Sequence, residues 1–375
     1  MEGTYKIKNL GLIEMRNSFG NYISVTLFGE SHGPEIGVVV DGLTAGIAVD
    51  EGFIADRLAR RRPSGDISTK RVEKDEFRIV SGVFNGYTTG APLCIMIPNT
   101  NTQSKDYSSL AYLPRPGHAD YTAQCKYNGY QDYRGGGHFS GRLTAPLVAA
   151  GAIAQMALES KGIKIGTHIS QMGEIEDRKL DNIDEDIDYL KHSVALDSDK
   201  WAQMQEYIRS AAADGDSVGG ILETVVTGMP VGVGEPWFDG VEGVIARAIY
   251  AIPAVKGVEF GAGFGFGKMR GSQANDAFGV KNGQVVTLTN NNGGINGGIT
   301  NGMPIVFRTA VKPTPSIFIE QDSVNLQTMT EEKLSLKGRH DPAIVHRAAP
   351  VVDAMTALAV LDMLLTRFGT DYITR

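Results

Sequence analysis

Cysteine is scarce in this sequence and long hydrophobic runs are missing, and both facts narrow what the protein can be. Only two of the 375 residues, Cys94 and Cys125, are cysteines, and they lack the C-x-x-C spacing of metal and redox sites. A zinc site built from cysteines is therefore excluded, and a reduced compartment fits best. No stretch approaches the roughly 18 consecutive apolar residues of a membrane span, and the N-terminus lacks the apolar segment of a signal peptide. We expect a cytoplasmic protein without a membrane partner.

Positive charge is in the minority. Lysine and arginine number 36 against 43 aspartates and glutamates, which gives a net charge of −7. This balance argues against a general nucleic-acid-binding surface, although it still allows a local basic pocket. No H-E-x-x-H sequence occurs, so a zinc protease is excluded and we expect no bound metal.

The length bounds the architecture. At roughly 150 residues a domain, 375 residues correspond to two or three domains or to one large α/β domain, and such a chain needs no metal or disulfide to stabilise its core. We expect a single domain over residues 15–375, preceded by an extension of residues 1–14. Ten acidic residues lie within 174–200, and this stretch is predicted to be a variable, solvated insertion.

Hydrophobic periodicity, punctuated by glycine and proline, predicts a mixture of helices and strands. Helices are expected over 50–62, 142–160, 239–252 and 350–367, the last with Pro350 at its first position and Gly369 after its end. β-Branched runs predict strands over 22–28, 36–41, 221–227 and 305–312. Because these elements do not alternate as regular βαβ units, the predicted class is α+β. Gly-Gly-Ile sequences near Gly219 and Gly297 hint at two related halves.

Two familiar motifs are present only in part. Gly29–Gly33 reads G-E-S-H-G and matches the turn that carries the nucleophile of α/β-hydrolases. That turn needs a helix after it, whereas Pro34 and a β-branched run follow here, so a Ser31 hydrolase is only a rival interpretation. The glycine-rich run Gly261–Lys268 has neither the spacing of a dinucleotide site nor that of a phosphate-binding loop.

The strongest signal is a set of arginine and histidine residues embedded in glycine and proline. It consists of six segments: Glu30–Gly33, Arg60–Pro63, Arg115–Asp120, Arg134–Arg142, Lys312–Ser316 and Gly338–Pro342. Arginine binds carboxylates and phosphates through two parallel hydrogen bonds, and glycine lets backbone N–H groups approach a ligand. Arg142 also opens an alanine-rich helix, whose N-terminal amides favour an anion. A net-acidic protein with such a pocket points to a specific, small anionic metabolite.

Three of these segments, read with their neighbours, resemble the chorismate synthase family. They are Phe28–Gly33 (F-G-E-S-H-G), Arg115–Asp120 (R-P-G-H-A-D) and Gly338–Pro342 (G-R-H-D-P), and the resemblance covers nearly the whole chain from Met15. It implies an α+β fold in which two antiparallel four-stranded sheets pack together and are enclosed by helices. It also implies a homotetramer.

The resemblance implies a carbon–oxygen lyase at the last step of the shikimate pathway. Members convert 5-enolpyruvylshikimate-3-phosphate to chorismate by a 1,4-anti elimination of phosphate, and they need reduced FMN although no net oxidation occurs. His32 would protonate the departing phosphate, His118 would neutralise the reduced flavin, and Asp341 would relay the C6 proton through flavin N5. The phosphate and two carboxylates of the substrate would be bound by Ser31, Arg61, Arg115, Arg142 and Arg339.

The resemblance also implies contacts to the flavin. They fall on His138, Phe139, Ser140, Pro253, Ala254, Gly297, Lys312, Pro313, Thr314, Pro315, Ser316 and again Arg339. Two sources of reductant stay open, namely an outside reductant, which we favour, and NADPH oxidised by the protein itself. A non-catalytic anion-binding or flavin-binding relative is another alternative, but it would have to lack one of the three acid–base residues.

The sequence departs from the family pattern at three places. His138-Phe139 stands where many members have Arg-Ser, so one hydroxyl contact to the flavin is missing. Ile67 stands where an arginine is usual, and Arg71 is the candidate to supply that cation. Asp353 replaces a glutamate.

Overall fold

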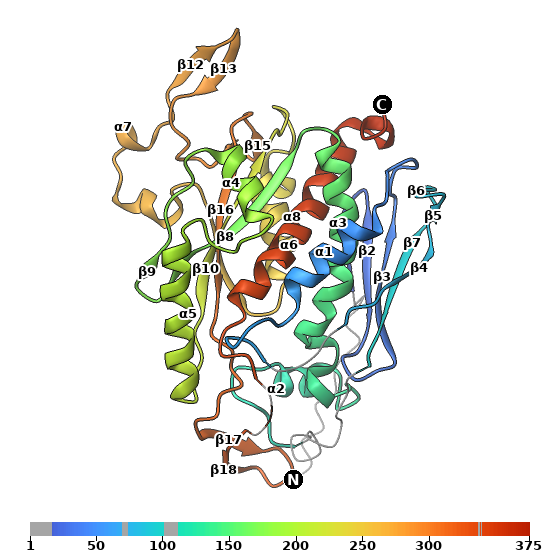
Figure 1. Cartoon of the computed structure of the whole chain (residues 1–375), viewed down its shortest axis with the longest axis vertical. Helices are drawn as coiled ribbons and strands as arrows, with labels where there is room; N and C mark the ends of the chain where they lie inside the picture. Colours follow the sequence, from blue (N-terminus) through green and yellow to red (C-terminus); the bar gives the residue numbers. More distant parts are fainter. Residues whose placement is uncertain (1–16, 70–73, 101–111, 337, 339) are drawn as a thin grey trace, which may run out of the picture.

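Two antiparallel sheets flank a central layer of helices in this computed structural model, which describes residues 17–69, 74–100, 112–336, 338 and 340–375 (Figure 1). The first sheet has the strand order β1(Ser18–Phe19), β2(Ser24–Gly29), β3(Glu35–Asp41), β7(Leu93–Pro98), β4(Arg78–Ser81). The second has the order β11(Val255–Phe260), β16(Ile305–Val311), β10(Gly220–Thr227), β8(Lys164–Met172), β9(Ile175–Glu176). Each sheet has five strands rather than the expected four, because the two-residue strands β1 and β9 extend their edges. The expected extension of residues 1–14 lies outside the described residues, as do Arg71 and Arg339.

The central layer of the described chain contains α1(Glu51–Arg61), α3(Thr144–Glu159), α6(Val241–Tyr250) and α8(Val345–Phe368). α3 packs along α8 and contacts β3 and β7 of the first sheet, while α8 contacts β8 and β10 of the second. Figure 1 shows both helices between the two sheets. The expectation that the sheets pack directly on each other inside a layer of helices is therefore wrong. α4(Ile183–Leu190) and α5(Ser198–Ala213) lie on the side away from the first sheet, against β8 and β9.

The composition of α3 and α8 explains why they lie inside. Both helices are buried on nearly every face, and a helix that is apolar all round must be covered on all sides. Gly151 lets them approach closely, because a Cβ at this position would lie 2.4 Å from the Cβ of Ala354. By length and composition, the segments Gly141–Glu159, which contains α3, and Val345–Phe368 could cross a membrane, yet 83% and 100% of their apolar windows are buried inside the protein. They are the core helices of the fold.

The two halves of the chain repeat one topology. β2, β3, α1, β4, β7 and α3 follow one another in the first half, and β8, β10, α6, β11, β16 and α8 in the second. The strand orders β2-β3-β7-β4 and β8-β10-β16-β11 match position for position. The prediction of two related halves is confirmed, but the Gly-Gly-Ile sequences on which it was based do not mark the two halves. Gly219 precedes β10 and Gly297 precedes β15(Ile299–Thr300), so both Gly-Gly-Ile sequences lie in the second half.

The predicted helices correspond to α1, α3, α6 and α8, and the predicted strands to β2, β3, β10 and β16. Strands β4, β7, β8 and β11 were not predicted. α8 begins at Val345 rather than at Pro350, which lies inside the helix and leaves the carbonyl of His346 without its usual helical donor. The acidic stretch of residues 174–200 is folded rather than simply solvated, because it includes β9 and α4 and buries Ile187 and Asp186.

The other described elements are short. The strands are β5(Val83–Phe84), β6(Tyr87–Thr88), β12(Phe278–Lys281), β13(Gln284–Thr287), β14(Ile295–Asn296), β17(Gln321–Asn325) and β18(Thr330–Leu334). The helices include α2(Asp120–Lys126) and α7(Gly271–Ala274). Glycine-rich turns over Arg134–Phe139 and Gly141–Leu143 lead into α3 and bring the arginine and histidine segments toward its start.

Candidate active site

A cavity of about 890 Å³ opens at one end of the helical layer. α3 and α8 begin there, with Thr144 and Ile344 in the wall, and α1 and α6 end there, with Arg61 and Tyr250. The first N–H groups of a helix have no partner within it, so the two helix N-termini favour an anion. Ligand sites usually measure about 300–1,000 Å³, so this cavity has room for more than one small molecule.

Two of the predicted substrate-binding arginines are held together by a carboxylate that sequence reasoning missed. Arg61 and Arg142 both pair with Asp75, Arg61 at 2.8 Å. The Asp75 side chain is fully buried, and its backbone φ of +51° is uncommon outside glycine. Burial alone would raise the pKa of Asp75, but the two guanidinium groups outweigh this effect and leave the pKa lowered. Arg62 Nε lies 3.9 Å from the same carboxylate, so Asp75 gathers three cations and the cluster keeps a net positive charge.

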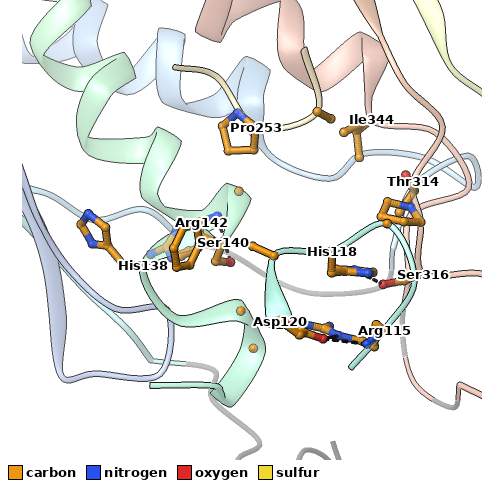
Figure 2. A pocket seen from close by; sticks show the side chains of 18 of the residues that line it. Arg115, His118, Asp120, His138, Ser140, Arg142, Pro253, Thr314, Ser316 and Ile344 are labelled. Atoms are coloured by element: carbon orange, nitrogen blue, oxygen red, sulfur yellow. Dashed lines mark hydrogen bonds and ion pairs between the residues drawn. The ribbon is translucent and has the colours of Figure 1, made fainter. Parts of the chain in front are cut away.

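Arg115 and His118 lie in the loop before α2. Arg115 donates from Nε and Nη2 to the two oxygens of Asp120, each at 2.8 Å. His118 Nε2 lies 2.8 Å from Oγ of Ser316, and its Nδ1 lies 3.2 Å from the carbonyl oxygen of Pro116. Because a carbonyl only accepts, the ring proton belongs on Nδ1 and the Ser316 hydroxyl donates to Nε2. Figure 2 shows His118 and Ser316 facing each other beside the Arg115–Asp120 pair.

Burial lowers the pKa of His118 to about 4, and the Arg115 guanidinium acts in the same direction. The unfolded chain, with the ordinary value of 6.5, therefore binds this proton first as the pH falls. The stability that neutral His118 contributes is present above about pH 6.5 and is lost as the pH falls toward 4. We expect His118→Gln to lose less free energy of unfolding than the wild type across this range, as measured by urea unfolding of the ligand-free protein. Equal losses in both proteins would contradict the lowered pKa.

Asp341 lies in the cavity wall just before α8, and both of its oxygens are bound. Oδ1 accepts from the backbone N–H of Thr69 at 2.7 Å, and Oδ2 pairs with Arg347 in the first turn of α8. Arg347 also donates from Nε to the carbonyl oxygen of Arg61 at 2.9 Å. Arg339, two residues before Asp341 in the sequence, lies outside the described residues.

Ser31 and His32 follow β2 but are not among the residues that line the cavity. Ser31 Oγ lies 3.1 Å from His32 Nδ1 and within 3.2 Å of the carbonyl oxygens of Arg134 and Gly135. A Cβ on Gly135, whose φ is +60°, would lie 2.1 Å from His32 Cε1. Only glycine fits there, and its backbone borders both His32 and the cavity. Ser31 is buried, and strand β3 rather than a helix follows it, which argues against a hydrolase nucleophile.

Most residues expected to contact a flavin line the cavity. They are His138, Phe139, Ser140, Pro253, Ala254, Lys312, Thr314, Pro315 and Ser316. Figure 2 labels five of them: His138, Ser140, Pro253, Thr314 and Ser316. Gly297 and Pro313 are not among the lining residues. His138 donates from Nδ1 to the carbonyl oxygen of Gly29 at 2.8 Å, which leaves its Nε2 as an acceptor. Ala254 has φ +73°, and its carbonyl oxygen accepts from the Lys312 N–H, so a strained backbone is held in the wall.

The departures from the family pattern at Ile67 and Asp353 lie in the interior of the protein. Ile67 is 4% exposed within the hydrophobic core, so an arginine there would have to bury its charge rather than reach the cavity. The carboxyl of Asp353 lies 3.9 Å from Arg60, and burial raises the pKa of this carboxyl.

Lys256 and Arg347 also line the cavity and supply positive charge that was not predicted from the sequence.

From the sequence, five histidines, namely His138, His168, His192, His340 and His346, were favoured as hydrogen-bonded turn residues. His168 is hydrogen-bonded as expected, with Nδ1 2.8 Å from Asp177, but it is buried on strand β8 rather than in a turn. His346 is also buried, and its Nε2 lies 2.8 Å from Oγ of Ser68. His340 lines the cavity, so its expected role as a simple turn residue was too narrow.

Other lining residues, including Thr69, Gln131 and Ile344, carry no motif that could have identified them. Asp120 could have been found, because it ends the Arg115–Asp120 segment. Asp75 could not have been found, because its partners Arg61 and Arg142 are 14 and 67 positions away in the sequence. Arg347 could not have been found, because it lies in the first turn of α8, which was predicted to begin only at Pro350.

Comparison with known proteins gives one consistent result. A family model described as chorismate synthase matches residues 23–365. The chain is 48% identical to the chorismate synthase of Thermococcus gammatolerans over 95% of this chain and 99% of the relative. It is 47% identical to that of Pyrococcus abyssi over 93% and 97%. A solved crystal structure of chorismate synthase superimposes with a TM-score of 0.75, at 31% identity and over 95% of both chains. The chain therefore belongs to the chorismate synthase family.

Proposed function

We propose that His32, His118 and Asp341 are the acid–base residues of this carbon–oxygen lyase. As a member of its family, the enzyme converts 5-enolpyruvylshikimate-3-phosphate to chorismate with loss of phosphate. One observation carries the assignment of His118 and Asp341: segments more than 200 positions apart bring them to one cavity together with Arg61, Arg115, Arg142 and Arg347. His32 is assigned by the family resemblance. Arginines that merely form ion pairs at the protein surface would not gather at one cavity.

The cations of the wall suit the anionic groups of the substrate. Arg61 and Arg142, joined by Asp75, present a net positive charge, and charge-assisted bonds to phosphate or carboxylate are among the stronger hydrogen bonds. Two of the donors of Arg115 already bind Asp120, so we propose that its remaining donors face the substrate. Ser31 and Arg339 remain part of this proposal by resemblance.

The acid–base groups would divide the two proton movements. Asp341 would hold the proton lost from C6 on its carboxylate, whose position is set by Thr69 and Arg347. His32, beside the side-chain-free backbone of Gly135, would supply a proton to the departing phosphate. His118 is neutral in the ligand-free protein and would become charged beside an anionic ligand, which favours the imidazolium form.

The wall also fits a flavin, and the family implies a reduced flavin requirement. Thr314 Oγ1 and Gln131 Oε1 are buried at the cavity without a hydrogen-bond partner in the described part of the chain. Buried polar atoms are normally hydrogen-bonded, so these two suit the polar groups of a ligand. Pro253 and Ile344 supply apolar surface, and Lys312 supplies charge. We propose FMN as this flavin. When bound, reduced flavin supplies electron density as the C–O bond breaks.

The direct test is anaerobic turnover of 5-enolpyruvylshikimate-3-phosphate. We expect chorismate to form with FMN and dithionite, with many turnovers per flavin, because the flavin undergoes no net oxidation. Equal rates with oxidised FMN, or without flavin, would refute this cofactor assignment. NADPH in place of dithionite tests the source of reductant, and we expect no turnover with NADPH alone. A fluorophosphonate probe should leave Ser31 unlabelled, whereas a hydrolase would react.

We propose that the enzyme is a homotetramer in the cytoplasm. Among the described strands, β12 and β13 pair only with each other, and they project from the body of the molecule (Figure 1). Their apolar residues are largely exposed, namely Phe278, Val280, Val285 and, just after the hairpin, Leu288, at 67–77%. A lone two-stranded hairpin is marginally stable in water, and exposed apolar strands pair readily with another chain. A second copy of the chain would cover this hairpin.

Placing two charges on the hairpin is expected to disrupt the tetramer. Val280 and Val285 lie opposite each other in the hairpin, so Val280→Glu with Val285→Glu places like charges at the proposed contact. Sedimentation should show four chains for the wild type and fewer for the double variant. Tyr189→Glu, on the exposed face of α4, is the control and should stay tetrameric. A tetrameric double variant would place the interface elsewhere, and a monomeric wild type would remove the tetramer.

A further inference from the structure

His346 is a buried histidine that the proposed acid–base chemistry does not use. It lies in the first turn of α8 and is 6% exposed. The centroid of its ring lies 6.2 Å from the ring centroid of Trp201 on α5. Its Nε2 is 2.8 Å from the Ser68 hydroxyl, while its Nδ1 has no hydrogen-bond partner in the described part of the chain. An unpaired buried N–H is costly, so the ring proton belongs on Nε2 and is donated to Ser68.

Ser68 lies directly next to a contact of Asp341. The backbone N–H of Thr69, the following residue, donates to Asp341 Oδ1 at 2.7 Å. The other oxygen of Asp341 pairs with Arg347, the residue after His346. Two consecutive residues of α8 therefore hold Asp341 from two sides, one directly and one through the segment 68–69.

We infer that His346 is a positioning residue for Asp341, acting through the Ser68 hydroxyl and the Thr69 amide. This inference rests on the proposed proton-accepting role of Asp341. Without the bond from His346, the segment 68–69 is freer to move, and the Thr69 amide no longer defines the direction of the carboxylate. A misplacement of about 1 Å at a reacting group can lower a rate by roughly 10²-fold, so we expect a loss of about tenfold for this indirect contact.

Ser68→Ala is the main test, because it removes one hydroxyl and leaves the His346 ring in place. In the ligand-free protein, we expect faster hydrogen–deuterium exchange of the peptide that carries the Thr69 amide. In the active enzyme, we expect turnover to fall about tenfold, KM to stay within threefold, and the isotope effect from deuterium at C6 to rise. His346→Gln, whose amide nitrogen can replace Nε2, should retain most of the turnover.

Two controls separate positioning from general stabilisation. Ser170→Ala removes a hydroxyl bound to the carbonyl oxygen of Ile221 in the second sheet, and it should change neither exchange at Thr69 nor the isotope effect. In an Asp341→Asn background, Ser68→Ala should cause no further loss of turnover, because contacts that act only through Asp341 are not additive.

The inference is overturned if Ser68→Ala leaves the Thr69 exchange or the isotope effect unchanged. It is also overturned if Ser68→Ala lowers turnover equally in the wild-type and Asp341→Asn backgrounds. Failure of the proposed function has a different signature, because Asp341→Asn would then keep full turnover while the exchange measurement still reports on the contact itself.

Discussion

Asp341→Asn is expected to lower turnover by about 10²- to 10⁴-fold, the usual contribution of a general acid or base. Asparagine keeps the size of the side chain and can still accept from the Thr69 amide, but it cannot take up the C6 proton. Affinities for substrate and FMN should stay within a few-fold, because the cations of the wall are unchanged. Removal of the C6 proton should become slower, so the isotope effect from deuterium at C6 should increase.

The competing role for Asp341 is an ion-pair anchor, and its described partner is Arg347. An anchor predicts that affinity falls together with turnover and that the isotope effect stays the same. It also predicts that Arg347→Gln, which breaks the pair from the other side, is as damaging as Asp341→Asn. Binding, turnover and the isotope effect measured on both variants separate the two roles, and the anchor result would remove Asp341 from the acid–base residues.

Asp75→Asn is expected to weaken both the fold and substrate binding. Asparagine tolerates the positive φ at this position, so the substitution chiefly removes the charge between Arg61 and Arg142. Breaking a buried ion pair typically costs about 3–5 kcal/mol, because the remaining charge stays buried, and the Arg61 side chain is only 3% exposed. The two guanidinium groups would also repel each other, so KM should rise more than turnover falls.

Urea unfolding and steady-state kinetics test this expectation. Asp66→Asn is a matched control, because Asp66 also pairs with an arginine, Arg209, but at the exposed surface, where screening by water leaves the pair little effect on stability. Unchanged unfolding and an unchanged KM in Asp75→Asn would show that Arg61 and Arg142 keep their places without this carboxylate.

Several parts of the fold could be predicted because they depend on local physics. The Asp50 carboxylate caps α1 by accepting from Gly52 and Phe53, and Gly369, with φ +82°, ends α8. β-Branched runs formed strands where expected. The beginning of α8 was misplaced because Pro350 is favoured at the first turn of a helix but is also tolerated inside one whose neighbours hold it in place.

The amino-acid sequence by itself determined the family and the α+β class, and it predicted most of the arginines and histidines that line the cavity, because these follow from residue types at short spacing. Tertiary structure decided that α3 and α8 lie between the sheets, since a helix that is apolar on every face needs cover on both sides. It also decided which carboxylates organise the site. Asp75 joins Arg61 to Arg142 only because the end of α1 and the start of α3 meet at one cavity, and Arg347 pairs with Asp341 because α8 begins before Pro350. No local pattern encodes such pairings, because an ion pair depends on distance in space and not on separation along the chain.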